Sequence, residues 1–201
     1  MIAITLLLAA AAPQTAVEAE RAFAADAQAI GQWTAFRKWA APDAIFLPPQ
    51  PVSKALKDAP DPAVSVDWWP TASFVSCDGA TAANTGGALW PGGRSSYFST
   101  IWRRQPDGGW RWLLDHGNDL ATPRTRVSSP VIRRASCQGT PAHNEEAGAQ
   151  GGTSRDGTLR WHWTVAPDGG HTFAVQLWTG TTYEMVIDDR VPAPPARVKP
   201  R

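Results

Sequence analysis

Asp115 and His116 are adjacent residues of two types that often exchange protons in enzymes. They end the segment WRWLLDHG at 110–117, which has the composition of a strand. Strand alternation predicts one face with Arg111, Leu113 and Asp115, and an opposite face with Trp112, Leu114 and His116. Burial of Asp115 among apolar side chains would raise its pKa and suit it to acid–base work. Alternatively, Asp115 bonds to the backbone or an arginine and caps the turn at Gly117, while His116 faces outward or packs over a helix.

The preceding predicted strand, at 95–104, supplies further polar candidates. Tyr97 can donate a phenolic hydrogen bond to a ligand and is the second catalytic candidate beside Asp115. Arg103 and Arg104 are adjacent, so one of them faces the inside or the edge of the sheet. Arg104 is a candidate for binding a substrate carboxylate, and the alternative is an arginine–Asp115 ion pair across the hairpin.

Eleven tryptophans are many for a chain of 201 residues, and most lie in predicted strands. Tryptophan rings can line a pocket for a flat, apolar or sugar-like ligand. Alternatively, they fill the core of a thin sheet. Together with Arg104 and His116, the candidates for ligand binding are Trp39, Trp68, Trp102 and Trp112.

The sequence contains no pattern typical of a metal or cofactor site. Its four histidines lack the spacing of metal ligands, and Walker A, dinucleotide-binding and nucleophile-elbow motifs are absent. The formal net charge is +1, with no basic stripe, which argues against nucleic acid as a partner. We therefore expect no metal and no cofactor, and a small molecule as the ligand.

The N-terminus has features of an export signal. An apolar run at 2–12 is far shorter than a membrane span and ends in small alanines. We expect a cleaved signal peptide at 1–14, a periplasmic or secreted protein, and no membrane span after processing. The alternatives are an uncleaved anchor or a buried N-terminal helix.

The two cysteines, Cys77 and Cys137, agree with export. In an oxidising compartment a lone pair of cysteines can close one disulfide, and we predict that this pair does so. The alternative is two buried, unpaired thiols.

The elements that must position these residues are helices followed by strands. The region 15–41 is rich in helix formers with an apolar face, interrupted at Gly31, which predicts two helices or one kinked helix. A strand at 44–47 and a short helix at 52–59, with Ser53 as its cap, should follow. Separate strands are expected at 64–69, 71–77 and 80–89, with Pro70 at a bulge or sheet edge.

A hairpin is predicted at 95–117, with its turn at Pro106-Asp107-Gly108-Gly109. A mobile surface loop at 138–157, a second hairpin at 158–178 and a last strand at 182–188 complete the expected elements.

Two segments resemble a known superfamily. AERAFAADAQAIGQWTAFRKWAAPDAIFLPP (19–49) is similar to the opening of nuclear transport factor 2-like proteins, where helices lead into a first strand. YFSTIWRRQPDGGWRWLLDHG (97–117) resembles the hairpin of the SnoaL-like branch of unknown function, with its W-R-R-x-x-D-G-x-W-x-x-x-x-D-x-G pattern. The resemblance covers 16–120. It implies an α+β fold: a cone-shaped barrel of twisted antiparallel sheet with N-terminal helices, here with a C-terminal β-hairpin extension.

The superfamily includes ketosteroid isomerase and other enzymes beside non-catalytic binding modules, so the resemblance implies a pocket and no particular reaction. In the isomerase a catalytic aspartate follows the first strand, whereas Leu47, Pro48 and Pro49 stand there in this chain. We expect a protein that binds a small apolar or aromatic molecule. The alternatives are a lyase or isomerase that uses a pocket carboxylate, and a non-catalytic module that forms a homodimer through its open sheet face. The expected organisation is a signal peptide at 1–14, a cone domain at 15–120, its extension at 121–190 and a disordered tail at 191–201.

Overall fold

The computed structural model describes residues 13–141 and 150–194. Most of the predicted signal peptide at 1–14 and part of the predicted tail at 191–201 lie outside the described residues, as does the middle of the predicted loop at 138–157. In the described ranges, no helix has the length and apolar character needed to cross a membrane.

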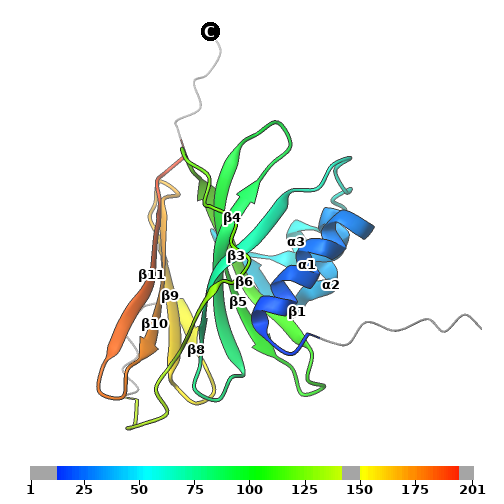
Figure 1. The fold of residues 1–201 in the computed structure, drawn as a ribbon. Helices are drawn as coiled ribbons and strands as arrows, with labels where there is room; N and C mark the ends of the chain where they lie inside the picture. Colours follow the sequence, from blue (N-terminus) through cyan, green and yellow to red (C-terminus); the bar gives the residue numbers. More distant parts are fainter. Residues whose placement is uncertain (1–12, 142–149, 195–201) are drawn as a thin grey trace, which may run out of the picture.

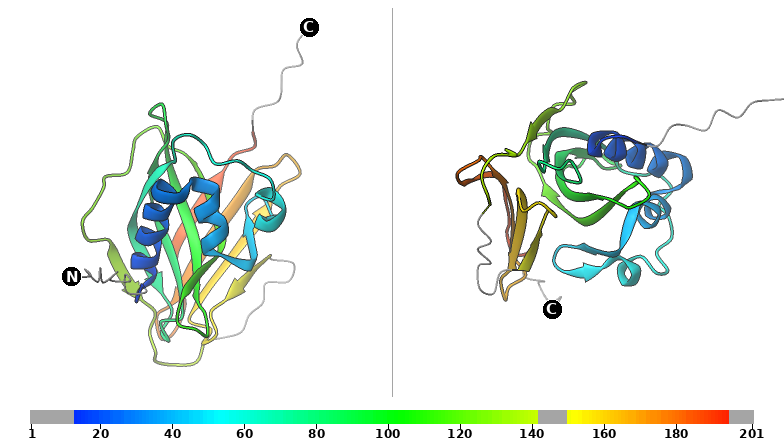
Figure 2. Two further views of the ribbon diagram at one scale, coloured as in Figure 1. Left: turned by 90° about the vertical axis from the view of Figure 1, so that its right-hand side faces the viewer. Right: turned by 90° about the horizontal axis from the view of Figure 1, so that it is seen from below.

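The fold has three layers (Figures 1 and 2). Helices cover one face of a curved seven-stranded sheet, and a four-stranded antiparallel sheet packs against the other face. This arrangement confirms the predicted α+β class, with N-terminal helices and a C-terminal β extension. The elements are α1 (Ala16–Ile30), α2 (Gln32–Trp39), β1 (Ala40–Phe46), β2 (Gln50–Pro51), α3 (Val52–Ala55), β3 (Asp67–Val75), β4 (Thr81–Leu89), β5 (Ser95–Arg104), β6 (Trp110–Asp119), β7 (Val131–Arg134), β8 (Gln150–Thr153), β9 (Leu159–Val165), β10 (His171–Trp178) and β11 (Tyr183–Val191).

The helical region forms two helices, because Gly31 interrupts it. Thr15 and Glu18 form a capping box at the start of α1. Gly31 adopts φ 101°, a backbone conformation that favours glycine. Asp61, from the loop before β3, accepts hydrogen bonds from the first backbone N–H groups of α2, including that of Thr34 at 3.0 Å. The third helix is shorter than predicted: α3 is a single turn. Pro51 occupies its N-cap position, so the prediction of Ser53 as its cap is wrong.

The larger sheet has the order β2-β1-β6-β5-β4-β3-β7. Its pairs are antiparallel except β1–β6 and β3–β7, which are parallel. The two strands predicted at 64–69 and 71–77 are one strand, β3, with a register shift at Pro70. The predicted bulge is thus confirmed, but β3 lies between β4 and β7 and not at the sheet edge.

The predicted hairpin at 95–117 is confirmed as β5 and β6, and it contains a bulge that was not predicted. Ile101 pairs with Leu114, whereas the next residue, Trp102, pairs with Trp112, so Leu113 is an extra residue in β6. The bulge changes the alternation of faces. Trp112 and Asp115 therefore both face the helices, and the predictions that Asp115 faces away from Trp112 and shares a face with Arg111 are wrong.

The second sheet has the order β11-β10-β9-β8 and includes a strand that was expected to be loop. Four residues of the Gly-rich segment 138–157 form β8, which pairs with β9. Phe173 and Val175 of β10 are fully buried on the face that meets the larger sheet, and the ring of Phe173 lies 4.7 Å from that of His116.

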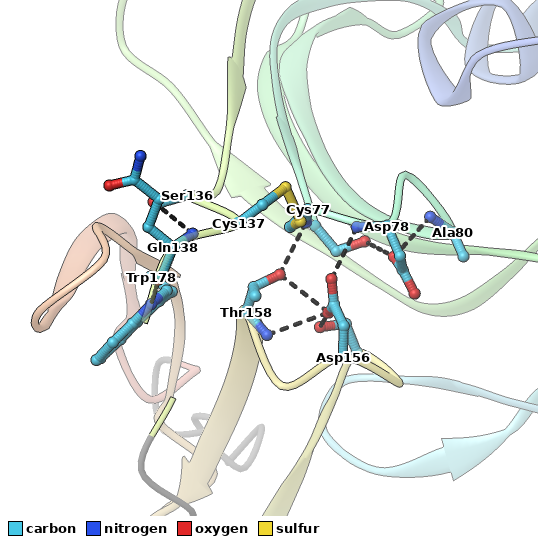
Figure 3. The surroundings of a disulfide bond; sticks show 11 residues. Cys77, Asp78, Ala80, Ser136, Cys137, Gln138, Asp156, Thr158 and Trp178 are labelled. Carbon is cyan, nitrogen blue, oxygen red and sulfur yellow. Dashed lines mark hydrogen bonds between the residues drawn. A yellow bond between two sulfur atoms is a disulfide. The ribbon is translucent and has the colours of Figure 1, made fainter. Parts of the chain in front are cut away.

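A disulfide joins the segment after β3 to the segment that leads into the second sheet (Figure 3). Cys77 and Cys137 are bonded, with their Cα atoms 5.2 Å apart, which confirms the predicted pair. Hydrogen bonds reinforce this connection, because the N–H of Cys77 donates to Thr158 Oγ1 at 2.8 Å and the N–H of Asp78 donates to Asp156 Oδ2 at 2.7 Å.

Candidate functional site

A cavity of about 480 Å³ lies between the helices and the curved sheet. Its wall combines rings from α1 and α2 with side chains from the strands beneath them, and most of it is apolar. Such a volume is sufficient for a small organic molecule. The apolar and aromatic lining residues are Phe23, Trp33, Phe36, Phe46, Leu47, Leu56, Val66, Trp68, Ala88, Trp90, Tyr97 and Phe98.

Asp115 places a half-buried carboxyl group in this cavity. Thr100, its partner across β5 and β6, donates its hydroxyl to Asp115 Oδ2 at 2.6 Å. Loss of hydration raises the pKa of Asp115 to about 7, which the Thr100 hydrogen bond opposes and the nearby Glu20 carboxylate reinforces. The carboxyl group can therefore gain or lose a proton near neutral pH.

The prediction that an arginine pairs with Asp115 is wrong. Arg103 lies 3.6 Å from Asp43 Oδ1, and Arg104 donates to the carbonyl oxygen of Gly108 at the hairpin turn. Arg104 is exposed and is not part of the cavity wall. The structure thus places Arg104 outside the cavity.

Glu20 is a second buried carboxyl group, and it was not among the predicted site residues. Its side chain is fully buried and accepts hydrogen bonds from Trp68 Nε1 at 2.9 Å, Trp102 Nε1 at 2.7 Å and Asn84 Nδ2 at 3.2 Å. Burial raises its pKa to about 7, although the three donors oppose the rise. Helical spacing could have identified it, since Glu20 occurs three residues before Phe23 on the apolar face of α1.

The four predicted binding tryptophans divide between the cavity and the core. Trp68 lines the cavity, whereas Trp39, Trp102 and Trp112 are buried and are not among the lining residues. Trp39 Nε1 donates to Asp26 Oδ2 at 2.6 Å, and the rings of Trp102 and Trp112 pack around Phe23.

Tyr97 and His116 border the cavity, but their side chains make their contacts toward the second sheet. His116 Nε2 lies 3.0 Å from Asp189 Oδ2 of β11, and the ring of Tyr97 meets the edge of the His116 ring. Burial raises the pKa of the Tyr97 phenol. Tyr97 pairs with Asn118 and not with Asp115, so the two predicted catalytic side chains lie on opposite faces of the sheet.

A charged pair lies at the polar end of the cavity. Arg94 contacts Asp119 at 2.6 Å, and its guanidinium group stacks 4.3 Å from the ring of Trp90. Trp90 in turn donates to Ser96 Oγ at 2.9 Å. All four residues line the cavity, so this end is polar while the wall under the helices is aromatic.

Comparison with known proteins identifies a structural similarity. A solved structure described as a "putative ketosteroid isomerase" from Parabacteroides distasonis ATCC 8503 has 18% sequence identity to this chain and a TM-score of 0.45. The similarity covers 56% of this chain and 94% of that one. No family model and no curated protein matches the sequence.

Proposed function

We propose that this chain binds a small apolar or aromatic molecule in the cavity, with the carboxyl group of Asp115 as its main polar contact. The observation that carries the proposal is a half-buried carboxyl group in a cavity whose wall is mostly aromatic. An apolar wall supplies binding free energy, while a single convergent polar group orients the ligand.

The family assignment is part of the same proposal. The W-R-R-x-x-D-G-x-W pattern forms the hairpin of β5 and β6, and the helices precede a curved sheet as they do in nuclear transport factor 2-like proteins. These features support membership of the SnoaL-like branch of that superfamily.

We also propose that the protein functions in the periplasm or outside the cell. The disulfide between Cys77 and Cys137 supports this location, because such bonds persist in oxidising compartments. N-terminal sequencing of protein recovered from the periplasm or medium tests it. A mature chain that begins between residues 12 and 19 is expected, and recovered protein that still begins at Met1 would contradict signal cleavage.

Binding can be tested with N-phenyl-1-naphthylamine, an apolar dye whose fluorescence rises in apolar surroundings. We expect saturable binding to one site per chain. Ala88→Phe, which adds a ring to the cavity wall, should weaken binding at least about tenfold. Ala121→Phe, the same substitution at an exposed position, is the matched control. Equal affinities of the two variants would contradict the proposal, once near-UV circular dichroism has shown that both are folded.

A second candidate function is proton transfer on a bound carbonyl compound. It is favoured by the Asp115 pKa of about 7, which suits a general base at neutral pH. The test is exchange of the α-protons of 2-tetralone with D₂O, followed by NMR. Exchange that is faster with the protein than with buffer, and lost in Asp115→Asn, would establish it. Equal exchange in both proteins would exclude it for this ketone.

A further inference from the structure

The carboxyl group of Asp115 faces the cavity without a positively charged side chain beside it among the described residues. Of the described residues, Glu20 from α1 is the charged group that faces it, and Glu20 is also a carboxylate. Arg94 is the positively charged side chain of the cavity wall, and Asp119 already pairs with it at 2.6 Å. His116, adjacent in sequence, has its side chain on the opposite face with Asp189. No described residue supplies Asp115 with a positive partner.

One oxygen of Asp115 is available to a ligand. Thr100 donates to Oδ2, while Oδ1 has no hydrogen-bond donor among the described residues. Oδ1 is also absent from the buried polar atoms that lack a partner, so it is open to the cavity. A donor group on a bound molecule can therefore reach it.

The wall around this oxygen is aromatic. Phe46 lies opposite Asp115 in the pairing of β1 with β6, and Phe98 is two residues before Thr100, on the same face of β5. The ring of Phe36 lies 5.9 Å from that of Phe46. Aromatic faces carry a partial negative charge and attract cations, and this attraction is stronger where water is excluded.

Resting on the proposed binding function, we propose that the ligand is an aromatic or apolar amine whose protonated nitrogen binds Asp115 Oδ1 among these rings. An ammonium group supplies both the positive charge and the hydrogen-bond donor that the cavity lacks. A neutral hydroxyl compound would supply a donor without the charge. A carboxylate ligand would approach Asp115 unfavourably and would have to displace Asp119 from Arg94.

Three ligands of matched shape separate these cases: 2-(1-naphthyl)ethylamine, 2-(1-naphthyl)ethanol and 3-(1-naphthyl)propionate. Isothermal titration calorimetry at about pH 8, where Asp115 is ionised and the amine is protonated, should show the amine binding at least about tenfold more tightly than the alcohol. Asp115→Asn should abolish that preference. The control Asp58→Asn, at an exposed position outside the cavity wall, should retain it.

The pH dependence on the unmodified chain gives a second readout that does not rely on a variant folding. The affinity for the amine should fall at least about fivefold from about pH 8 to about pH 6, because Asp115 and the nearby Glu20, each with a pKa of about 7, both become protonated. Affinity for the alcohol should change less.

The outcomes are distinguishable. Equal binding of amine and alcohol, or tightest binding of the propionate, overturns the amine proposal while the binding function stands. If none of the three ligands binds and N-phenyl-1-naphthylamine does not bind either, both the amine proposal and the proposed binding function are overturned.

Discussion

Replacing Glu20 with glutamine is expected to change how the free energy of unfolding depends on pH. Glu20 is fully buried and its hydrogen-bond partners are neutral N–H groups, so burial raises its pKa from 4.5 to about 7. Between these pH values the folded protein retains a proton that the unfolded chain has released. Stability contributed by this group therefore falls as pH rises from about 4.5 to about 7 and is constant above.

The size of the effect follows from the two pKa values. Each pH unit of difference corresponds to about 1.4 kcal/mol, so ionised Glu20 destabilises the folded chain by about 3 kcal/mol above pH 7. Glutamine carries no charge, but its amide nitrogen would face an indole donor or Asn84. We therefore expect Glu20→Gln to cost about 1–3 kcal/mol at about pH 4 and to become about 3 kcal/mol less costly by about pH 8.

Urea unfolding of the wild type and the variant at a series of pH values measures this difference. Subtracting the two curves removes contributions common to both proteins, including that of His171, whose pKa burial lowers. Glu18→Gln is the matched control from the same helix. Hydrogen bonds from backbone N–H groups lower the pKa of Glu18, so its effect should appear below about pH 4.5 and with the opposite sign. A Glu20→Gln difference that does not vary between about pH 4.5 and 7 would refute the reasoning.

Two further predictions concern the sheets. Replacing Cys77 and Cys137 with serine opens a loop of 60 residues and should lower the free energy of unfolding by about 4 kcal/mol. Urea unfolding checks this. Dithiothreitol should lower the unfolding midpoint of the wild type and leave that of the variant unchanged. Gly86→Ala should cost about 1–3 kcal/mol, because the added Cβ would lie 1.9 Å from the carbonyl oxygen of Trp69. Gly109→Ala, where the atoms nearest to the added Cβ belong to the Asp107 side chain, should cost less than about 0.5 kcal/mol. An equally small cost of Gly86→Ala would be inconsistent with the close strand pairing.

Local chemistry in the sequence accounts for much of the fold. Gly31 predicted the break between α1 and α2, Pro70 predicted a bulge, and the Pro-Asp-Gly-Gly turn predicted the hairpin of β5 and β6. Each of these features depends on backbone preferences of one to four residues. Such preferences act before any tertiary contact forms.

Apart from the disulfide, several features that depend on distant contacts were not predicted. The parallel pairing of β1 with β6 joins segments about 70 residues apart, and β8 has glycines and polar residues that only its pairing with β9 places in a strand. The bulge at Leu113 shifts the alternation along β6, so counting faces from Trp110 assigned Asp115 the wrong neighbours.

The distinction between local preferences and distant contacts also applies to the site. Asp115 was a candidate because of its residue type and its place at the strand end, and the structure puts it in the cavity. Its role in binding or catalysis stays a prediction. The contacts of His116 with Asp189 and of Glu20 with Trp102 join residues more than 70 positions apart, and neither pair follows from sequence spacing.

A titration of the Asp115 side-chain carbon by NMR tests the central claim most directly. Protein labelled with ¹³C at aspartate side chains is followed from about pH 3 to 9, and Asp115→Asn identifies the signal. If Asp115 lies in a desolvated aromatic cavity, its carboxyl group should titrate near pH 7, and addition of 2-(1-naphthyl)ethylamine at neutral pH should move the signal toward that of the ionised form. A midpoint close to the ordinary value of 3.8, unaffected by the amine, would contradict the account.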